Sequence, residues 1–311
     1  MDRELWRTVL SEVKRAARRV PRVGRRPRFA DWLIVALYIW SVWHDRCLSW
    51  ACDRSHYGPL FRPRKLPSIS QFTRRVKTPE VQAILQQVHN ALAERGLTTD
   101  AVYIDGKPLL VSPVSKDRQA TRGKISGGFG KGYKLHAVVN DRRRIVVWSV
   151  MGLNVAEQSV AAELLALLPP LTPQALVMAD SNYDSAPLYK QGDERGVVLI
   201  TPLKGQARVG PEGHHPMTLI QMGPARRELV QTWKDRPELM HLVLKMRDEI
   251  ERVFGVLVCT GGGLAGLPAW VRTLDRVRRW VGVKIILYNA RLKVQDRLQK
   301  AEESQSFAVA A

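Results

Sequence analysis

The stretch AVYIDGK, residues 101–107, places an aspartate directly after a run of apolar, β-favouring residues. A short apolar run of this kind predicts a buried strand that ends near Asp105. A second apolar run, residues 175–179, leads to Asp180 in the same way. In α/β sheets the chemistry lies beyond the carboxyl ends of buried strands. We therefore expect Asp105 and Asp180 to meet at one edge of a sheet.

A third carboxylate, Glu251, lies in a helical pattern whose apolar side carries Leu242, Met246, Ile250, Val253 and Phe254. If this helix packs over the two strands, three carboxylates converge around a divalent cation, an arrangement typical of phosphoryl transfer. Arg247 lies four residues before Glu251 and so shares its helix face. A simple i,i+4 ion pair is the structural alternative for these two residues.

The order of predicted elements indicates the fold. Three successive antiparallel strands are predicted over residues 102–111, 133–139 and 145–153. A helix over 157–168, the strand before Asp180, a helix over 187–195 and a strand over 197–202 follow. This is the order of an RNase H-like core, an α/β mixed sheet flanked by helices. We assign it to residues 99–300, with a Gly- and Pro-rich insertion near 205–237.

Residues 1–98 predict a separate, basic, all-α domain with helices over 4–20, 29–43 and 80–95. Ser68 or Ser70 can cap a short helix through residues 71–76. That helix and its end carry Arg74, Arg75 and Lys77, as in a helix-turn-helix reader of DNA. Any small basic helical bundle would show the same pattern. A basic helix over 274–299 and a disordered tail over 301–311 close the chain.

The net charge of the 311 residues is +20, and more than half of it lies in residues 1–78. Clustered positive charge indicates a polyanionic partner, and nucleic acid is the first candidate. Three cysteines are too few for a disulfide scaffold, and the charged N-terminus resembles no signal peptide. The apolar run 32–43 is shorter than the roughly 20 residues of a membrane span. We expect a cytoplasmic protein without a membrane segment.

Other sites receive less support from the sequence. The spacing of His44, Cys47, Cys52 and His56 admits a zinc site, but its Cys-x4-Cys pair is looser than common structural pairs and aromatic neighbours favour a core edge. The glycines of residues 261–263 lack the Lys-Ser/Thr of a phosphate-binding loop. No Gly-x-Ser-x-Gly elbow is present, so hydrolase chemistry with a serine nucleophile is not supported.

Four short motifs, taken together, resemble a known family. They are YIDG at 103–106, GYKLH at 132–136, ADSNYD at 179–184, and Arg247 followed by IE at 250–251 and FG at 254–255. With this order and spacing, the chain resembles bacterial insertion-sequence DDE transposases, which have an RNase H-like catalytic domain. The resemblance implies that Asp105, Asp180 and Glu251 hold two Mg²⁺ ions, for which Mn²⁺ can substitute. Hard oxygen ligands suit Mg²⁺.

The resemblance also implies an activity and its partners. The enzyme would cut and rejoin the ends of its own insertion sequence, binding double-stranded DNA at terminal inverted repeats and at a target. A homodimer associated with the bacterial nucleoid would bring two ends together. Arg247 would contact phosphate beside the metal, and Lys131, Lys134 and His136 on the second strand would face the DNA backbone. A solvated strand face is the alternative for those three residues.

One departure leaves other functions open. Many relatives carry a Tyr three residues before the Arg and a Lys seven residues after the Glu, where this chain has Leu244 and Val258. A non-catalytic DNA-binding descendant of a transposase is therefore one alternative, and a metal-dependent nuclease without strand transfer is another. Near the C-terminus, mixed aromatic and cationic contacts to DNA or ordinary packing would explain the pattern of Trp270, Arg272, Arg276, Arg279 and Trp280.

Overall fold

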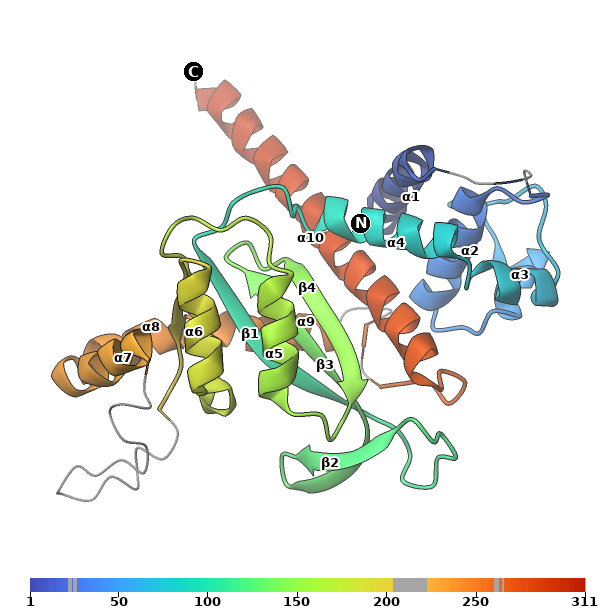
Figure 1. Ribbon diagram of the computed structural model, residues 1–311. Coiled ribbons are helices and arrows are strands. Elements are labelled where there is room, and N and C mark those ends of the chain that lie inside the picture. The colour runs from blue at the N-terminus through green and yellow to red at the C-terminus, as the bar shows by residue number, and fades with distance from the viewer. Residues whose placement is uncertain (22–23, 25–26, 204–222, 260–262, 265, 311) are drawn as a thin grey trace. The chain divides into compact units, whose positions relative to one another are not determined.

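The computed structural model describes residues 1–311 apart from 22–23, 25–26, 204–222, 260–262, 265 and 311 (Figure 1). Contacts between residues divide the chain into two compact units. The sheet unit comprises Arg95–Val256, and the helical unit combines Met1–Glu94 with Leu257–Ala311. Each unit has its own hydrophobic core.

Within the described residues of the sheet unit, one sheet contains β1 (Ala101–Leu110), β2 (Thr121–Ile125), β3 (Gly128–Asn140), β4 (Ile145–Gly152), β5 (Leu176–Met178) and β6 (Val198–Ile200). The strand order is β2-β3-β1-β5-β6, and β4 also pairs with β3. Strand β3 is antiparallel to β1 and β4, whereas β5 is parallel to both β1 and β6. This topology confirms the predicted RNase H-like mixed sheet.

Two helices cover the sheet where the sequence predicts them. Helices α5 (Glu157–Ala166) and α6 (Ala186–Glu194) lie side by side in front of the strands in Figure 1. The side of α5 that faces the strands buries Val160, Ala161, Leu164 and Leu165. Because these residues recur at helical spacing, the burial of one apolar face explains both the helix and its position.

The structure differs from the sequence prediction at three places in the sheet unit. Strand β2, which forms a hairpin with β3, was not predicted because its sequence TRGKI is half polar. Helix α7 (Pro224–Asp235) occupies the end of the segment predicted to be an irregular insertion, and α8 (Pro237–Lys245) follows it. The single helix predicted to carry Leu242 and Glu251 is divided between α8 and α9 (Asp248–Cys259), and Leu242 and Met246 are exposed, not on a buried face. The part of that insertion within 204–222 lies outside the described residues. Prolines at the first turns of α7 and α8 start these helices and do not interrupt them.

The helical unit contains α1 (Asp2–Arg19), α2 (Asp31–Trp43), α3 (Ile69–Arg75), α4 (Pro79–Leu92) and α10 (Leu274–Ala310). Helices α1, α2, α4 and α10 pack against one another. The ring of Trp6 lies 5.0 Å from that of Trp40 and 4.9 Å from that of Phe61, measured between centroids. Helix α3 begins with the predicted cap, since Ser68 and Gln71 form a capping box.

Helix α10 changes the expected domain boundaries. It was assigned to a catalytic domain over 99–300, but its contacts place it in the helical unit with α1 and α4. Val277, Val281 and Ile285 are buried there, so the C-terminal segment completes the core that the N-terminal helices begin. The segment 301–310, expected to be a disordered tail, continues α10 as helix. Among the described residues, no helix is long and apolar enough to cross a membrane.

The zinc arrangement suggested for His44, Cys47, Cys52 and His56 does not form. Cys47 Sγ lies 3.0 Å from Ser49 Oγ, and Cys52 Sγ donates to the backbone oxygen of Leu48. The ring of His56 stacks on that of Trp50 at 4.4 Å between centroids. These side chains belong to an aromatic core edge, the alternative that the sequence favoured.

Candidate active site

Asp105 and Asp180 lie at the same level on neighbouring strands. Strands β1 and β5 run parallel, with Tyr103 opposite Met178. Each aspartate follows two residues later, so the two lie side by side where β5 ends. Strand pairing therefore brings these two predicted site residues together, and the charge of Asp180 raises the pKa of Asp105. Strand β1 itself continues to Leu110, so the prediction that this strand ends near Asp105 was wrong.

Both carboxylates are partly buried. Burial raises the pKa of Asp105 to about 6, and the negative charge of Asp180 adds to this effect. Burial also raises the pKa of Asp180. Backbone N–H groups oppose these shifts, because Gly106 donates to Asp105 at 2.7 Å and Asn182 donates to Asp180 at 2.8 Å. Two desolvated carboxylates that repel each other form a site that a cation would stabilise.

Glu157 is a third acidic group near this pair, and the sequence analysis did not single it out. It is the first residue of α5. Burial is the main cause of the raised pKa of both aspartates, and the negative charge of Glu157 raises it further. Its side chain is 17% exposed and forms an ion pair with Lys134 of β3. The available signal was an acidic residue in the first turn of a helix that directly follows the three antiparallel strands.

Glu251 does not join the two aspartates. It lies on α9 (Asp248–Cys259), is 59% exposed, and accepts a hydrogen bond from Arg247 Nη2 at 2.8 Å. The charge of Arg247 lowers the pKa of both Asp105 and Asp180, so its guanidinium lies near the aspartates as well as Glu251. In the described part of the chain, no three His, Cys, Asp or Glu side chains are arranged to hold a metal.

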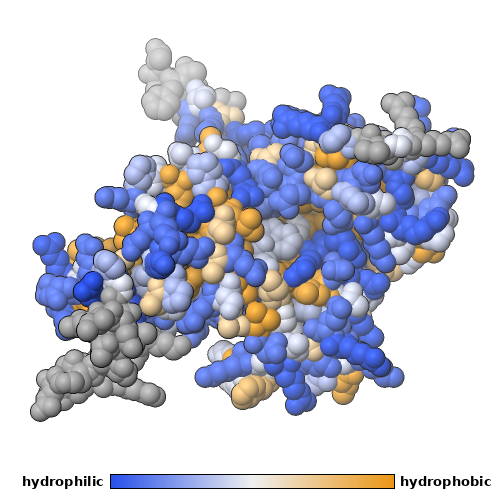
Figure 2. All heavy atoms as spheres, in the orientation of Figure 1, coloured by the Kyte–Doolittle hydropathy of each residue, from blue (hydrophilic) through white to orange (hydrophobic). Residues whose placement is uncertain are grey.

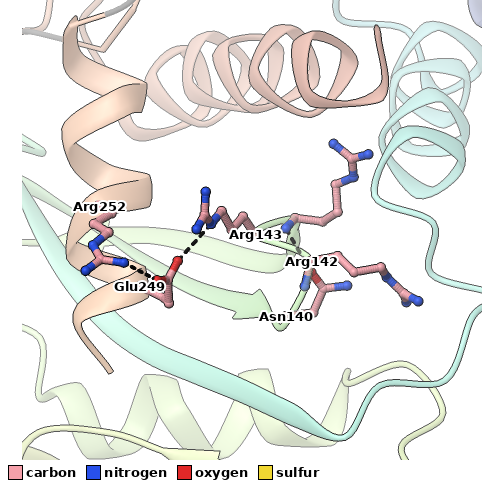
Figure 3. Close-up of polar contacts among 6 residues, drawn as sticks. Asn140, Arg142, Arg143, Glu249 and Arg252 are labelled. Atoms are coloured by element: carbon pink, nitrogen blue, oxygen red, sulfur yellow. Dashed lines mark hydrogen bonds and ion pairs between the residues drawn. The ribbon is translucent and has the colours of Figure 1, made fainter. Parts of the chain in front are cut away.

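The turn between β3 and β4 holds the start of α9 (Figure 3). Asn140 Oδ1 accepts hydrogen bonds from the backbone N–H groups of Arg142 and Arg144, at 3.2 and 2.8 Å. Arg143 adopts a φ of 60° and donates from Nε to Glu249 Oε2 at 2.8 Å. Glu249 also pairs with Arg252. Glu249 thus anchors α9 to the sheet while Glu251, two residues on, takes a different partner.

The predicted phosphate contacts of β3 are engaged inside the protein. Lys131 Nζ donates to the backbone oxygen of Ser115 at 2.6 Å, and Lys134 pairs with Glu157. His136 is fully buried, and burial lowers its pKa to about 4. A fully buried imidazole has no exposed atom for a DNA phosphate, so the contact of His136 stays a prediction that requires this part of β3 to open. Lys134 and His136, two residues apart, share the face of β3 on which Glu157 of α5 lies, whereas Lys131 is three residues from Lys134 and lies on the other face.

Two buried groups beside the carboxylates have no hydrogen-bond partner among the described residues. They are the imidazole of His136 and the hydroxyl of Tyr183. Burial raises the pKa of Tyr183 well above its ordinary value, and the charges of Glu157, Asp105 and Asp180 add to the shift. Unpaired buried polar groups are uncommon in native proteins and cluster at functional sites.

The predicted DNA-binding residues of the helical unit separate into two kinds. Arg75 pairs with Asp31 and donates to the backbone oxygen of Phe29 at 3.3 Å, so it joins α3 to the start of α2. Arg74 and Lys77 are exposed. Of these three predicted residues, Arg74 and Lys77 have side chains that an anion outside the protein can reach.

Comparison with known proteins adds the following findings. The family model described as Transposase DDE domain matches residues 96–290. Among solved structures, the chain is similar to the piggyBac transposase in a cryo-EM synaptic complex with hairpin DNA. The sequence identity is 11% and the TM-score 0.49, over 94% of this chain and 73% of that chain. No curated protein matches the chain.

Proposed function

The chain belongs to the Transposase DDE domain family, and from this premise we propose that it cuts and rejoins the ends of its own insertion sequence. The observation that carries the proposal is the pair of desolvated carboxylates, Asp105 and Asp180, at the carboxyl edge of an RNase H-like sheet. Buried carboxylates with raised pKa values in such a position suit a cation and an anionic substrate together.

Asp105 and Asp180 would hold a divalent cation, because carboxylate oxygens are the ligands that Mg²⁺ prefers and Mn²⁺ accepts. Such a cation supplies activation of a water or a DNA 3′-hydroxyl and stabilisation of the leaving oxygen. Arg247, which pairs with Glu251 and lies near the aspartates, would orient a phosphate of the DNA backbone. Glu157 would keep Lys134 beside the site and so set its local charge.

Glu251 is proposed as the third metal ligand after a small rearrangement. Glu251 pairs with Arg247 four residues earlier, and its own side chain is more than half exposed. Exposed pairs of this type contribute about 0–1 kcal/mol, so the pair opens at little cost. When Arg247 turns to a DNA phosphate, Glu251 is released toward the aspartates. Substrate and metal binding would then be coupled through one arginine.

The helical unit is proposed to bind double-stranded DNA, both the terminal inverted repeats and the target. Residues 1–78 carry more than half of the net charge of +20. The face of this unit that is visible in Figure 2 is mostly hydrophilic. Exposed Arg74 and Lys77 are placed for phosphate contacts. Joining two DNA ends requires two protomers, so we propose a homodimer that acts on nucleoid DNA in a bacterial cytoplasm.

The decisive experiment is cleavage of a duplex that carries the end of the element, with Mg²⁺ and with EDTA. Wild type should nick at the element boundary only with the metal, and Glu251→Gln should not nick. Asp248→Asn is the matched control, because Asp248 lies on the same helix, is exposed and carries the same charge. It should cleave as wild type does.

The outcomes separate the competing functions. Tight binding without any cut, in wild type as in Glu251→Gln, would favour the non-catalytic DNA-binding descendant, to which Leu244 and Val258 also point. Cutting at the boundary without joining to target DNA would favour a metal-dependent nuclease.

A further inference from the structure

A cavity of about 170 Å³ lies within the helical unit, between the end of α2, the end of α3 and the start of α10. Four cationic side chains line it, those of Arg46, Lys77, Arg276 and Arg279. Among the described residues that line the cavity, none is Asp or Glu. The cavity therefore favours an anionic ligand.

Two tryptophans give the same cavity an aromatic wall. Trp270 is 42% exposed, so a large part of its indole is open to a ligand. Trp280 is only 3% exposed, and its indole N–H has no acceptor in the described part of the chain. Lys284 Nζ lies 5.2 Å from the centre of the Trp280 ring and covers one of its faces. A ligand that accepts a hydrogen bond would satisfy the remaining polar group.

The backbone holds Trp270 in a defined position. Arg276 Nη1 donates to the backbone oxygen of Trp270 at 2.8 Å, which ties the connector before α10 to the first turn of that helix. Thr273, between them, has a φ of 69°. A β-branched residue in the left-handed region is strained, and such strain is typical of functional sites. The cavity wall is thus preorganised.

The guanidinium groups of the cavity lie close to its floor. Burial raises the pKa of the Tyr38 hydroxyl, and the charges of Arg279 and Arg276 act against that rise. Both arginines are therefore near the buried Tyr38, at the inner end of the cavity. An anionic group inside the cavity would be partly desolvated, which strengthens its attraction to arginine.

The size and chemistry of the cavity restrict the ligand. Its volume is below the roughly 300–1,000 Å³ of pockets that hold drug-sized molecules, so it accommodates one ring system or one small group. A flat aromatic wall, a free N–H donor and several cations together fit a nucleobase with its phosphate. A base inside a duplex is stacked on both faces and cannot enter a cavity, whereas an unpaired base can.

We infer that this cavity binds one unpaired nucleotide of a DNA strand, with its base against Trp270 and its phosphate against Arg276 and Arg279. The inference rests on the proposed function, because it concerns the DNA on which a transposase acts. An unpaired nucleotide arises where strands separate near a cut end. The helical unit would then recognise an opened DNA end as well as a duplex.

A second cavity in the same unit provides a matched control. It is lined by Lys14, Arg28, Arg62, Arg64, Lys65 and the aromatic Trp32, among others. Here cations already cover the aromatic rings, because Lys14 Nζ lies 5.3 Å from the centre of Trp32 and the Arg28 guanidinium 5.6 Å from that of Phe29. This surface should attract phosphates without stacking a base.

The test uses the full chain and two 2-aminopurine duplexes, one with the probe base as a single unpaired bulge and one fully paired. Wild type should bind the bulged duplex about tenfold more tightly, as expected for one base stacked on an aromatic side chain, and should quench its fluorescence. Trp270→Ala should abolish the preference and leave affinity for the paired duplex within about twofold. Trp270→Phe should restore part of the preference.

The control variant Arg62→Gln with Arg64→Gln should lower the affinity for both duplexes by the same factor. Equal affinity of wild type for the two duplexes would overturn the inference while leaving the proposed function intact. An equal loss of affinity for the bulged and the paired duplex in Trp270→Ala would overturn it as well. Failure of wild type to bind either duplex would instead remove the proposed function and the inference with it. Because Trp270 is partly exposed, Trp270→Ala should keep the thermal unfolding midpoint of wild type. An unchanged midpoint would show that a loss of preference for the bulged duplex does not come from misfolding.

Discussion

The two units differ in how they use charge. In the sheet unit, charged side chains are drawn into pairs around the carboxylates, such as Lys134 with Glu157 and Arg247 with Glu251. In the helical unit, cations such as Arg74 and Lys77 remain exposed. The first arrangement suits chemistry at a fixed point, and the second suits attraction of a long polyanion. Substitutions should therefore separate catalysis from binding according to the unit in which they lie.

The largest effect is expected from Asp105→Asn. The change would remove one of the proposed metal ligands and should lower the rate of DNA cleavage by about a thousandfold or more, since metal centres contribute several kcal/mol to the transition state. Affinity for duplex DNA should change by less than about twofold, because binding is assigned to the other unit. Nicking rates and binding isotherms measured on one preparation test both parts. Cleavage at the wild-type rate would show that the metal site is misassigned.

Asp184→Ala should destabilise the sheet unit. Asp184 accepts hydrogen bonds from Arg226 Nε and Nη2 at 2.9 and 2.8 Å, and both side chains are nearly fully buried. Removing one partner leaves a buried charge, which costs about 3–5 kcal/mol of unfolding free energy. Urea denaturation measures this loss.

The control for this change is Lys190→Ala, which breaks the exposed pair with Glu194 at 3.9 Å. It should cost less than about 0.5 kcal/mol. Similar losses in the two variants would mean that the buried ion pair does not stabilise the unit.

Glu157→Gln tests whether the newly found carboxylate supports the site. Without its negative charge, Lys134 is left unpaired beside the aspartates and should repel a cation. We expect Mn²⁺ affinity, measured by calorimetry without DNA, to fall about 10- to 100-fold, as for other groups that support metal ligands. The double variant Glu157→Gln with Lys134→Met should regain part of that affinity. Unchanged Mn²⁺ binding in the single variant would exclude a role for Glu157.

The smallest effect is expected from Arg74→Ala with Lys77→Ala in the helical unit. Loss of two phosphate contacts should reduce the slope of log affinity against log salt concentration by about 2. Cleavage at saturating protein should stay close to wild type. Arg75→Ala should behave differently and lower stability, because Arg75 pairs with Asp31. An unchanged salt slope in the double variant would place the DNA on another surface.

Much of the sheet unit was predictable because its signals are local. The apolar runs before Asp105 and Asp180 became β1 and β5, and the change from strands to helices along the chain matched the topology. Strand β2 was missed because its alternation is weak, and α7 and α8 because prolines and glycines resemble loops in a sequence. Burial of His136 could not be anticipated, since the period of a strand does not say which helix covers it.

By itself the sequence determined that apolar strands of an RNase H-like sheet lead to two aspartates and that a basic helical region accompanies it. Those features depend on periodicity and composition, which are properties of neighbouring residues. Only the tertiary structure decided that Glu157 lies near the aspartates, that Arg247 acts on them while it pairs with Glu251, and that α10 returns to the N-terminal helices. The physical reason is that burial and charge pairing unite residues far apart in the chain, and no local pattern records which of them will meet.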